Sequence, residues 1–202
     1  MADPAHPDRV SLARSGVDRH GLDRAANLLG ALALAVSDRS ADAVSAAAGR
    51  SDSAAAALSA LLHFLDRPTI DRLRQVLGLT SSGTVRLVDR LEESGYVCRV
   101  AGQDARSTAV MLTEAGVAAA EQVSAARTAV LLGSLSVLSD EERETFEHLI
   151  SKMLTGMIRG PGATRWTCRL CDIGVCAGAP GGCPVGNAAR ERYLKGATPA
   201  GG

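Results

Sequence analysis

The sequence predicts a mainly α-helical fold that carries one small β-hairpin (an α+β fold). Three observations favour it. Apolar residues recur at helical spacing over most of the chain. The hydrophobic fraction is 46% while aromatic residues make up only 2%, and a core of Ala, Leu and Val favours close-packed helices over a sandwich or barrel. The one region of extended character is short and is interrupted by a polar turn.

The first two expected helices form the N-terminal part of the domain. One runs from Gly21 to about Gly49, and the next is capped by Asp52 or Ser53 and ends before Pro68. The apolar residues of the first helix fall on one face: Leu22, Ala25, Ala26, Leu29, Leu32, Ala33 and Val36. Residues 1–20 show no periodicity and are expected to be disordered.

Two further helices follow, separated by a glycine. The first is a short helix from Ile70 to Leu77, and Gly78 after it can take the left-handed conformation that ends a helix. Thr80 or Ser81 then caps a longer helix over residues 82–94. A helix, a turn and a capped second helix make up the helix-turn-helix pattern.

The extended region behind this pattern predicts a β-hairpin. Residues 96–100 and 107–112 flank a polar turn that contains Asp104 and Arg106. An arginine at the tip of such a wing reaches DNA phosphates or the minor groove. Asp104 is expected to be structural, capping the turn or holding an arginine. Thr113 then begins a long helix to about residue 136, and Ser139 begins a last one to about residue 158.

In a helix-turn-helix the second helix lies in the major groove, with its N-terminal residues at the base edges. The side chains expected there are Ser81, Ser82, Thr84 and Arg86, with Arg90 placed one turn on for the DNA backbone. Leu87, Val88 and Leu91 are spaced to pack inward. The sequence therefore predicts a DNA-binding winged helix-turn-helix.

Two motifs resemble those of MarR-type transcriptional regulators. One is L-T-x3-T-V-R-L-V-D-R-L-E, from Leu79 to Glu92, and the other is the wing motif D-x-R-S-x4-L-T-x2-G, from Asp104 to Gly116. The resemblance covers residues of about 22 to 158, so the domain is placed at residues 21–159. It implies a homodimer whose interface is built from the long first and last helices, and palindromic operators that are usually bound for repression. Gly83 departs from the family, which often has a helix-friendlier residue there.

Charge and hydropathy bear on whether the protein binds nucleic acid, is secreted or crosses a membrane. The formal net charge is zero at pH 7, so the charge of the whole molecule gives no support for nucleic-acid binding. Residues 67–106 nevertheless hold seven arginines against five acidic residues. The N-terminus is polar and unlike a secretory signal, and the longest apolar run, Leu28 to Val36, is too short to cross a bilayer. We expect a cytoplasmic protein without a membrane segment.

Four cysteines cluster behind a Gly-Pro-Gly linker, with the spacing C-x2-C-x4-C-x6-C-P: Cys168, Cys171, Cys176 and Cys183. In the cytosol such clusters indicate metal or redox sites. Four thiolates suit a structural Zn²⁺ ion, and they also suit an iron–sulfur cluster, for which Cys-Pro at the last ligand is familiar. Metal-free thiol chemistry stays open. The knuckle is placed at residues 163–186 and a flexible tail at 187–202.

The leading hypothesis is a dimeric, sequence-specific transcription regulator whose cysteine cluster stabilises the protein or senses a signal, with a small-molecule or redox effector. Two alternatives are a thiol-redox protein that cycles Cys168 and Cys171, and a metal-handling adaptor whose winged helix binds protein. His63 and His148 have no partner ligands in sequence and are interpreted as ordinary histidines. No nucleotide loop, Ser/His/Asp order or paired acidic motif is present, so the sequence predicts no enzyme.

Overall fold

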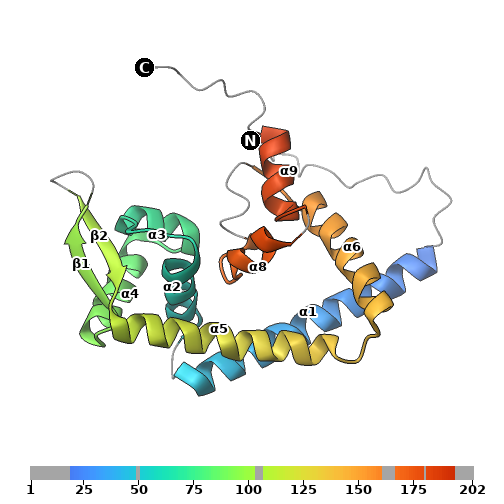
Figure 1. Ribbon diagram of the computed structural model, residues 1–202, viewed down its shortest axis with the longest axis horizontal. Coiled ribbons are helices and arrows are strands. Elements are labelled where there is room, and N and C mark those ends of the chain that lie inside the picture. Colours follow the sequence, from blue (N-terminus) through green and yellow to red (C-terminus); the bar gives the residue numbers. More distant parts are fainter. Residues whose placement is uncertain (1–18, 49–50, 103–106, 161–166, 180, 194–202) are drawn as a thin grey trace, which may run out of the picture.

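The computed structural model of the chain describes residues 19–48, 51–102, 107–160, 167–179 and 181–193. Figure 1 shows a lobe of short helices and a hairpin at one end of two long crossing helices. Another helix, α6, rises near the other end, and α8 and α9 lie between α6 and the lobe in this view. In chain order the elements are α1 (Arg19–Ala48), α2 (Asp52–His63), α3 (Ile70–Leu77), α4 (Ser81–Glu93), β1 (Val97–Ala101), β2 (Thr108–Leu112), α5 (Glu114–Leu135), α6 (Asp140–Gly156), α8 (Ile173–Gly178) and α9 (Pro184–Tyr193).

Local capping signals set the limits of α3 and α4. The Thr69 side chain accepts a hydrogen bond from the Arg72 N–H at 3.2 Å, and Gly78 ends α3 with a φ of 67°. Thr80 caps α4 in the same way, accepting from the Gly83 N–H at 3.1 Å. Each cap satisfies a backbone donor that the first helical turn leaves unpaired. The helix-turn-helix therefore forms where the sequence predicts it.

The wing is a two-stranded antiparallel sheet. In its register Val97 lies opposite Leu112 and Ala101 lies opposite Thr108. The hairpin is also fixed to the helices, because the Val110 N–H donates to the Pro68 carbonyl at 2.9 Å. Asp104 and Arg106, the residues expected at the wing turn, lie outside the described residues.

The core of this lobe lies between α2, α3, α4, the hairpin and the start of α5. Helix α2 is buried over the whole run 54–61, most of which is alanine. Small side chains allow the neighbouring helices to approach α2 closely, and larger ones fill the remaining space. The largest fully buried side chains here are Leu58, Leu73, Leu87, Val76, Val88, Val97 and Val110. We call this region, from α2 to the first turns of α5, the winged-helix lobe.

Outside the lobe, α1 packs along α5 (Figure 1). The apolar face predicted for α1 is largely exposed, and so is much of α6. The large apolar side chains left exposed on these helices are Leu22, Leu28, Leu29, Leu32 and Leu34 of α1, Leu132 of α5, and Leu149, Ile150 and Met153 of α6, with Met157 just after it. A single chain therefore leaves a broad apolar surface uncovered.

The C-terminal part differs from the expected boundaries. Residues 187–193, placed in a flexible tail by the sequence, belong to α9. The reason is packing, since Val185 and Ala189 are buried against Ile158, just beyond the end of α6. The Arg192 guanidinium also donates to the Thr155 carbonyl at 2.8 Å. Helix α9 is thus fastened to α6 by its own small core.

The mainly helical fold with one antiparallel hairpin confirms the predicted fold class. None of the helices in the described ranges is long and apolar enough to cross a membrane.

Candidate functional site

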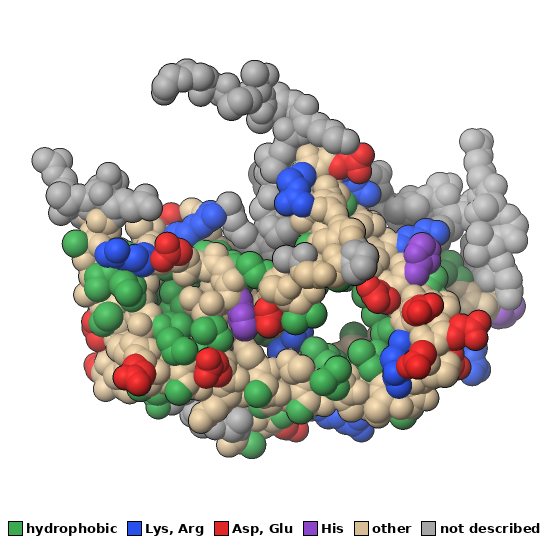
Figure 2. Space-filling view, in the orientation of Figure 1, with side chains coloured by type: hydrophobic (Ala, Val, Ile, Leu, Met, Phe, Trp, Pro, Cys, Tyr) green, Lys and Arg blue, Asp and Glu red, His purple; other side chains and the backbone are tan. Residues whose placement is uncertain are grey.

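The N-terminal half of α4 presents a polar and basic surface. Ser81, Ser82 and Arg86 are exposed there, and Arg90 follows one turn later. The opposite side of the helix is in the core, where Leu87, Val88 and Leu91 are each at most 2% exposed, as predicted. Val85 is also exposed and adds an apolar side chain to the outer surface. Figure 2 shows Lys and Arg side chains, with acidic side chains between them, along the upper edge of the winged-helix lobe. The arrangement suits contact with a polyanion.

Thr84 is a correction to the expected set. Its side chain is completely buried, and its hydroxyl donates to the Thr80 carbonyl at 3.0 Å. A threonine one turn into a helix can satisfy its hydroxyl on the backbone in this way and turn its methyl group into the core. Thr84 therefore orients α4 and does not belong to the outer surface.

Gly83, the departure from the family pattern, sits beside the cap of α4. A Cβ atom at this position would lie 3.0 Å from the Thr80 hydroxyl oxygen. That distance is tighter than ordinary packing, so a larger residue would have to shift the capping side chain. Glycine leaves the Thr80 cap undisturbed at the helix end that carries Ser81 and Ser82.

An ion-pair clamp joins α4 to the wing, and no sequence motif pointed to it. The Arg99 guanidinium on β1 contacts Asp89 at 2.5 Å and also pairs with Glu92. The Glu92 carboxylate accepts the Arg99 backbone N–H at 3.1 Å as well. The Asp89 hydrogen bond and the Glu92 charge raise the pKa of Arg99 against the opposing effect of burial. Helix α4 and the hairpin are thus held at a fixed spacing.

A second link supports the base of the wing. The Arg67 guanidinium donates to the Ala101 carbonyl, at the end of β1, at 3.1 Å. Arg67 also has a φ of 44°, a left-handed conformation that is uncommon outside glycine. Arg67 and Arg99 both belong to the basic stretch of the sequence, yet the structure uses them to brace the wing.

The four cluster cysteines lie on the turn at 168–171, on α8 and at the start of α9, in what we call the cysteine segment (residues 167–183). The Cys168 thiol hydrogen-bonds with the sulfurs of Cys171 and Cys183. Cys176 interacts electrostatically with Cys183 and Cys171. The fold thus brings Cys168 next to Cys171 and Cys183. Among the described residues, no group of three or more His, Cys, Asp or Glu side chains is already arranged as a ligand set for a metal ion.

The charges of the thiols follow from their neighbours. The pKa of Cys171 is lowered to about 6 by the hydrogen bond from Cys168 and by the Arg127 guanidinium, while burial opposes the shift. The pKa of Cys168 is raised by that same hydrogen bond, by burial and by the charges of Cys171 and Cys183. Burial raises the pKa of Cys176, and the nearby thiols and acids add to the effect. One negative charge is thus favoured at Cys171, next to a cation.

The cysteine segment is attached to the rest of the chain through Arg127, which no sequence pattern singled out, and through His63, which the sequence led us to interpret as an ordinary histidine. The Arg127 guanidinium of α5 donates to the Leu170 carbonyl at 3.2 Å. His63, the last residue of α2, lies with its Nδ1 atom 3.8 Å from an Asp172 carboxylate oxygen. The other ring nitrogen of His63 hydrogen-bonds with the Ser124 hydroxyl at 2.8 Å. No short motif announces these contacts, because they join residues far apart in the chain.

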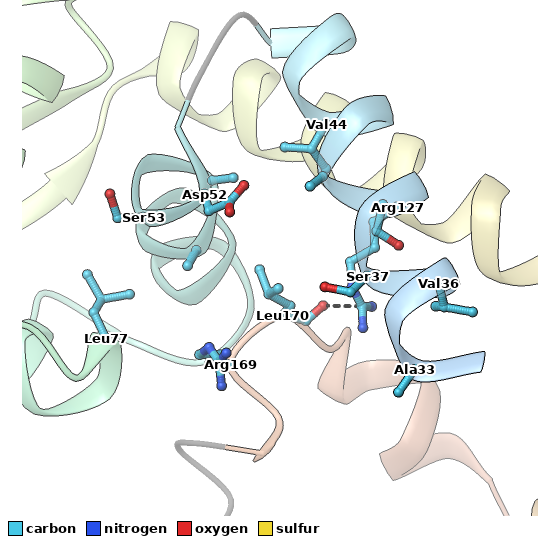
Figure 3. A pocket seen from close by; sticks show the side chains of 14 residues that line it. Ala33, Val36, Ser37, Val44, Asp52, Ser53, Leu77, Arg127, Arg169 and Leu170 are labelled. Carbon is cyan, nitrogen blue, oxygen red and sulfur yellow. Dashed lines mark hydrogen bonds between the residues drawn. The ribbon is translucent and has the colours of Figure 1, made fainter. Parts of the chain in front are cut away.

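A pocket of about 480 Å³ lies where this segment meets α1 and α2. Its walls are mostly apolar, and the guanidinium groups of Arg127 and Arg169 line it together with the acid Asp52. Figure 3 shows Leu170 and Arg169 entering from the cysteine segment, with the hydrogen bond from Arg127 to Leu170 between them and α1. The buried Ser40 hydroxyl, another lining residue, has no hydrogen-bond partner among the described residues. A volume of this size accommodates a small organic molecule.

The MarR family model matches residues 48–107, which run from the end of α1 to the wing. A MarR family protein from Bacillus stearothermophilus is 28% identical, with a TM-score of 0.62, over 69% of this chain and 97% of that one. YusO from Bacillus subtilis is 22% identical, with a TM-score of 0.58, over 69% and 97%. MepR, a transcription regulator of the Staphylococcus aureus multidrug efflux pump MepA, is 19% identical, with a TM-score of 0.58, over 66% and 98%. No curated protein matches the chain.

The residues that match the family model form the helix-turn-helix and the first strand of the wing. The matched residues include α2, α3, α4 and β1, and these are the elements that position the outer surface of α4 and the wing. The chain therefore has a winged helix-turn-helix fold that matches MarR structures, and its residues 48–107 are similar to the MarR family model.

Proposed function

We propose that the protein is a dimeric, sequence-specific DNA-binding transcription regulator that acts as a repressor. The observation that carries this proposal is the N-terminal surface of α4. Two small hydroxyl side chains and Arg86 are exposed at its start, and Arg99 fixes the helix against the wing strand. A rigid helix with small polar residues at its N-terminus can approach base edges, and Arg86 is long enough to grip guanine.

DNA binding is tested by comparing two arginine variants. Arg86→Ala should relax the preference at particular base pairs, weakening binding by about 1–3 kcal/mol at those positions. Arg106→Ala should weaken binding across all sequences and lower the salt slope by about one unit for each phosphate that the side chain no longer reaches. Fluorescence anisotropy with a selected operator and its point variants, over a range of salt concentrations, measures both effects.

The matched control for this experiment is Arg143→Ala, an arginine of α6 that pairs with Asp140 outside the winged-helix lobe. It should leave affinity and salt slope unchanged. If Arg86→Ala and Arg106→Ala behave like this control, the proposed DNA surface is wrong. Retained folding of each variant is checked by circular dichroism.

We further propose a homodimer built from the long helices. The support is the apolar face of α1, on which Leu29 and Leu32 are 48% and 45% exposed, together with the exposed apolar residues of α6. Pairing across a two-fold axis would bury both surfaces and place two α4 helices against half-sites about one DNA turn apart. A palindromic operator follows from that symmetry.

The expected result is a dimer at micromolar concentration by light scattering. The double variant Leu29→Glu/Leu32→Glu should shift the protein to monomers, because it places charges in an apolar interface. Val85→Glu, which alters an exposed apolar residue of α4, is the matched control and should stay dimeric while its DNA affinity falls. A wild-type monomer at micromolar concentration would refute the dimer.

The cysteine segment completes the proposal as a metal site. Cys168, Cys171, Cys176 and Cys183 would supply four thiolates, with Zn²⁺ as the first candidate and an iron–sulfur cluster as the alternative. The support is the C-x2-C-x4-C-x6-C spacing and the four-thiol donor set that it supplies. The 480 Å³ pocket is the candidate site for a small acidic effector, since two arginines line it.

A further inference from the structure

Three consecutive residues of the cysteine segment face α5 and the end of α2. Leu170 accepts a hydrogen bond from Arg127 of α5, Cys171 lies in the field of the same guanidinium, and Asp172 faces His63 of α2. Cys171 is itself an expected metal ligand, and Cys168 lies two residues before this stretch. Any change in how the thiols are held therefore acts on these contacts first.

One of these contacts is made by α2, a helix that packs directly against the recognition helix α4. His63 is the last residue of α2, and α2 packs against α3 and α4. Leu77, the last residue of α3, lines the same pocket as Arg169 and Leu170. Figure 3 shows the stretch passing between α1 on one side and the ends of α2 and α3 on the other. The segment thus lies at the junction between the long helices and the helix-turn-helix.

We propose that this junction makes DNA binding depend on metal bound by the cysteine segment. A thiophilic divalent cation held by the four thiols keeps Leu170–Asp172 against α2 and α5, and this fixes the angle between the helix-turn-helix and the long helices. Without metal the stretch is released, and the two recognition helices of the dimer no longer keep a defined spacing. The metal-loaded protein binds its operator more tightly. This inference rests on the proposed DNA-binding function.

Thermodynamic linkage requires that metal binding and operator binding affect each other equally. If metal raises operator affinity by some factor, operator DNA must raise metal affinity by the same factor. Couplings of this kind typically lie at about 5- to 150-fold. An equal factor in both directions distinguishes a coupled pair of sites from a metal that merely prevents aggregation.

The experiment uses full-length protein, purified without oxygen and then either loaded with Zn²⁺ or stripped with a chelator. Operator affinity is measured by fluorescence anisotropy, and Zn²⁺ affinity by competition with a chromogenic chelator, with and without operator. We expect zinc to tighten operator binding by at least about fivefold and operator to tighten zinc binding equally. Equal operator affinity in the two forms overturns the proposal.

The variant that tests the route is His63→Ala. It removes the interaction with Asp172, and the hydrogen bond to Ser124 of α5, without touching a thiol. The variant should therefore bind zinc and operator but show little dependence of one on the other. Arg143→Ala on α6 is the matched control and should keep the full dependence. A His63→Ala protein with undiminished dependence shows that the coupling does not pass through this junction and overturns the proposal.

A readout without DNA separates this inference from the proposed function. Hydrogen exchange at the end of α2, where the Phe64 and Leu65 amides both bond to the Ala60 carbonyl, should be slower in the zinc-loaded protein than in the stripped one. Slower exchange in a protein that binds no DNA would refute the proposed function but leave the junction intact. Identical exchange in both forms overturns the metal-dependent junction itself.

Discussion

Replacing Gly116 by alanine should strongly destabilise the winged-helix lobe. A Cβ atom at this position would lie 1.8 Å from the Tyr96 carbonyl oxygen and 2.8 Å from its carbonyl carbon. The clash is with backbone, which cannot turn aside as a flexible side chain can. We expect the free energy of unfolding to fall by about 3 kcal/mol or more, at the upper end of overpacking effects.

The hydrogen bonds around Gly116 prevent α5 from shifting to relieve the clash. Thr113 caps the start of α5, and its N–H donates to the Tyr96 carbonyl at 3.0 Å, while its hydroxyl donates to the Gly95 carbonyl at 2.6 Å. The same hydroxyl accepts the Gly116 N–H at 3.0 Å. Moving α5 away to make room for a methyl group would break this cap. The glycine that closes the wing motif is therefore required by a close approach of two backbones.

Gly133→Ala is the matched control, since this glycine lies in the same helix and nothing is within 4 Å of its Cβ position. It should be neutral or more stable by about 0.5–1 kcal/mol, because alanine is the better helix former. Urea unfolding followed by circular dichroism measures both variants. Equal midpoints for wild type and Gly116→Ala would contradict the close approach.

The features predicted correctly from sequence are those with local causes. Thr69, Gly78 and Thr80 each act within one helical turn, so a short stretch of chain contains the whole signal. The hairpin strands are likewise neighbours in sequence. This is why the limits of α3, α4, β1 and β2 could be placed almost to the residue.

The features that sequence reasoning missed arise from packing between distant segments. Thr84 was expected on the outer surface because its residue type suits DNA, but the rotation of α4 is set by the core residues around it. Arg99 is one of several arginines in a basic stretch, and only the fold brings it to Asp89 and Glu92. His63 carries no signal in the sequence, because Asp172 is far along the chain.

The C-terminal part also combines a local signal that the sequence shows with packing that it does not show. The cysteine spacing is recognisable as a motif, but the helix that follows it is not. Residues 187–193 contain few large apolar side chains, and α9 is held by two small residues, Val185 and Ala189, buried against Ile158. So few apolar residues do not distinguish a helix from a flexible tail in the sequence alone. The surface against which they pack has to be known.

Removing one thiol should have the largest effect on the C-terminal part. We expect Cys171→Ser to release the metal and to leave the cysteine segment open to protease. Ordering these residues costs on the order of 1–2 kcal/mol each in backbone entropy. Metal–thiolate bonding, on the order of 10 kcal/mol in small zinc modules, is the expected compensation. The winged-helix lobe, with its separate core, should stay folded.

The position of cleavage makes the test specific. Arg169 lies between Cys168 and Cys171, so trypsin should cut after it in the metal-free variant and not in the loaded wild type. Helix α9 is held by its own contacts to α6, so cleavage at Arg192 should stay slow in both proteins. The metal content of protein purified without oxygen, measured by mass spectrometry, identifies zinc or iron.

Cys98→Ser is the matched control, because this cysteine lies on β1 opposite Met111 and away from the segment. It should keep the metal and the resistance at Arg169. The same release and cleavage are expected for serine at Cys168, Cys176 or Cys183, because each thiolate completes one four-ligand set. Wild-type protein that contains neither zinc nor iron, yet resists cleavage at Arg169, would contradict a metal site and favour plain thiol chemistry.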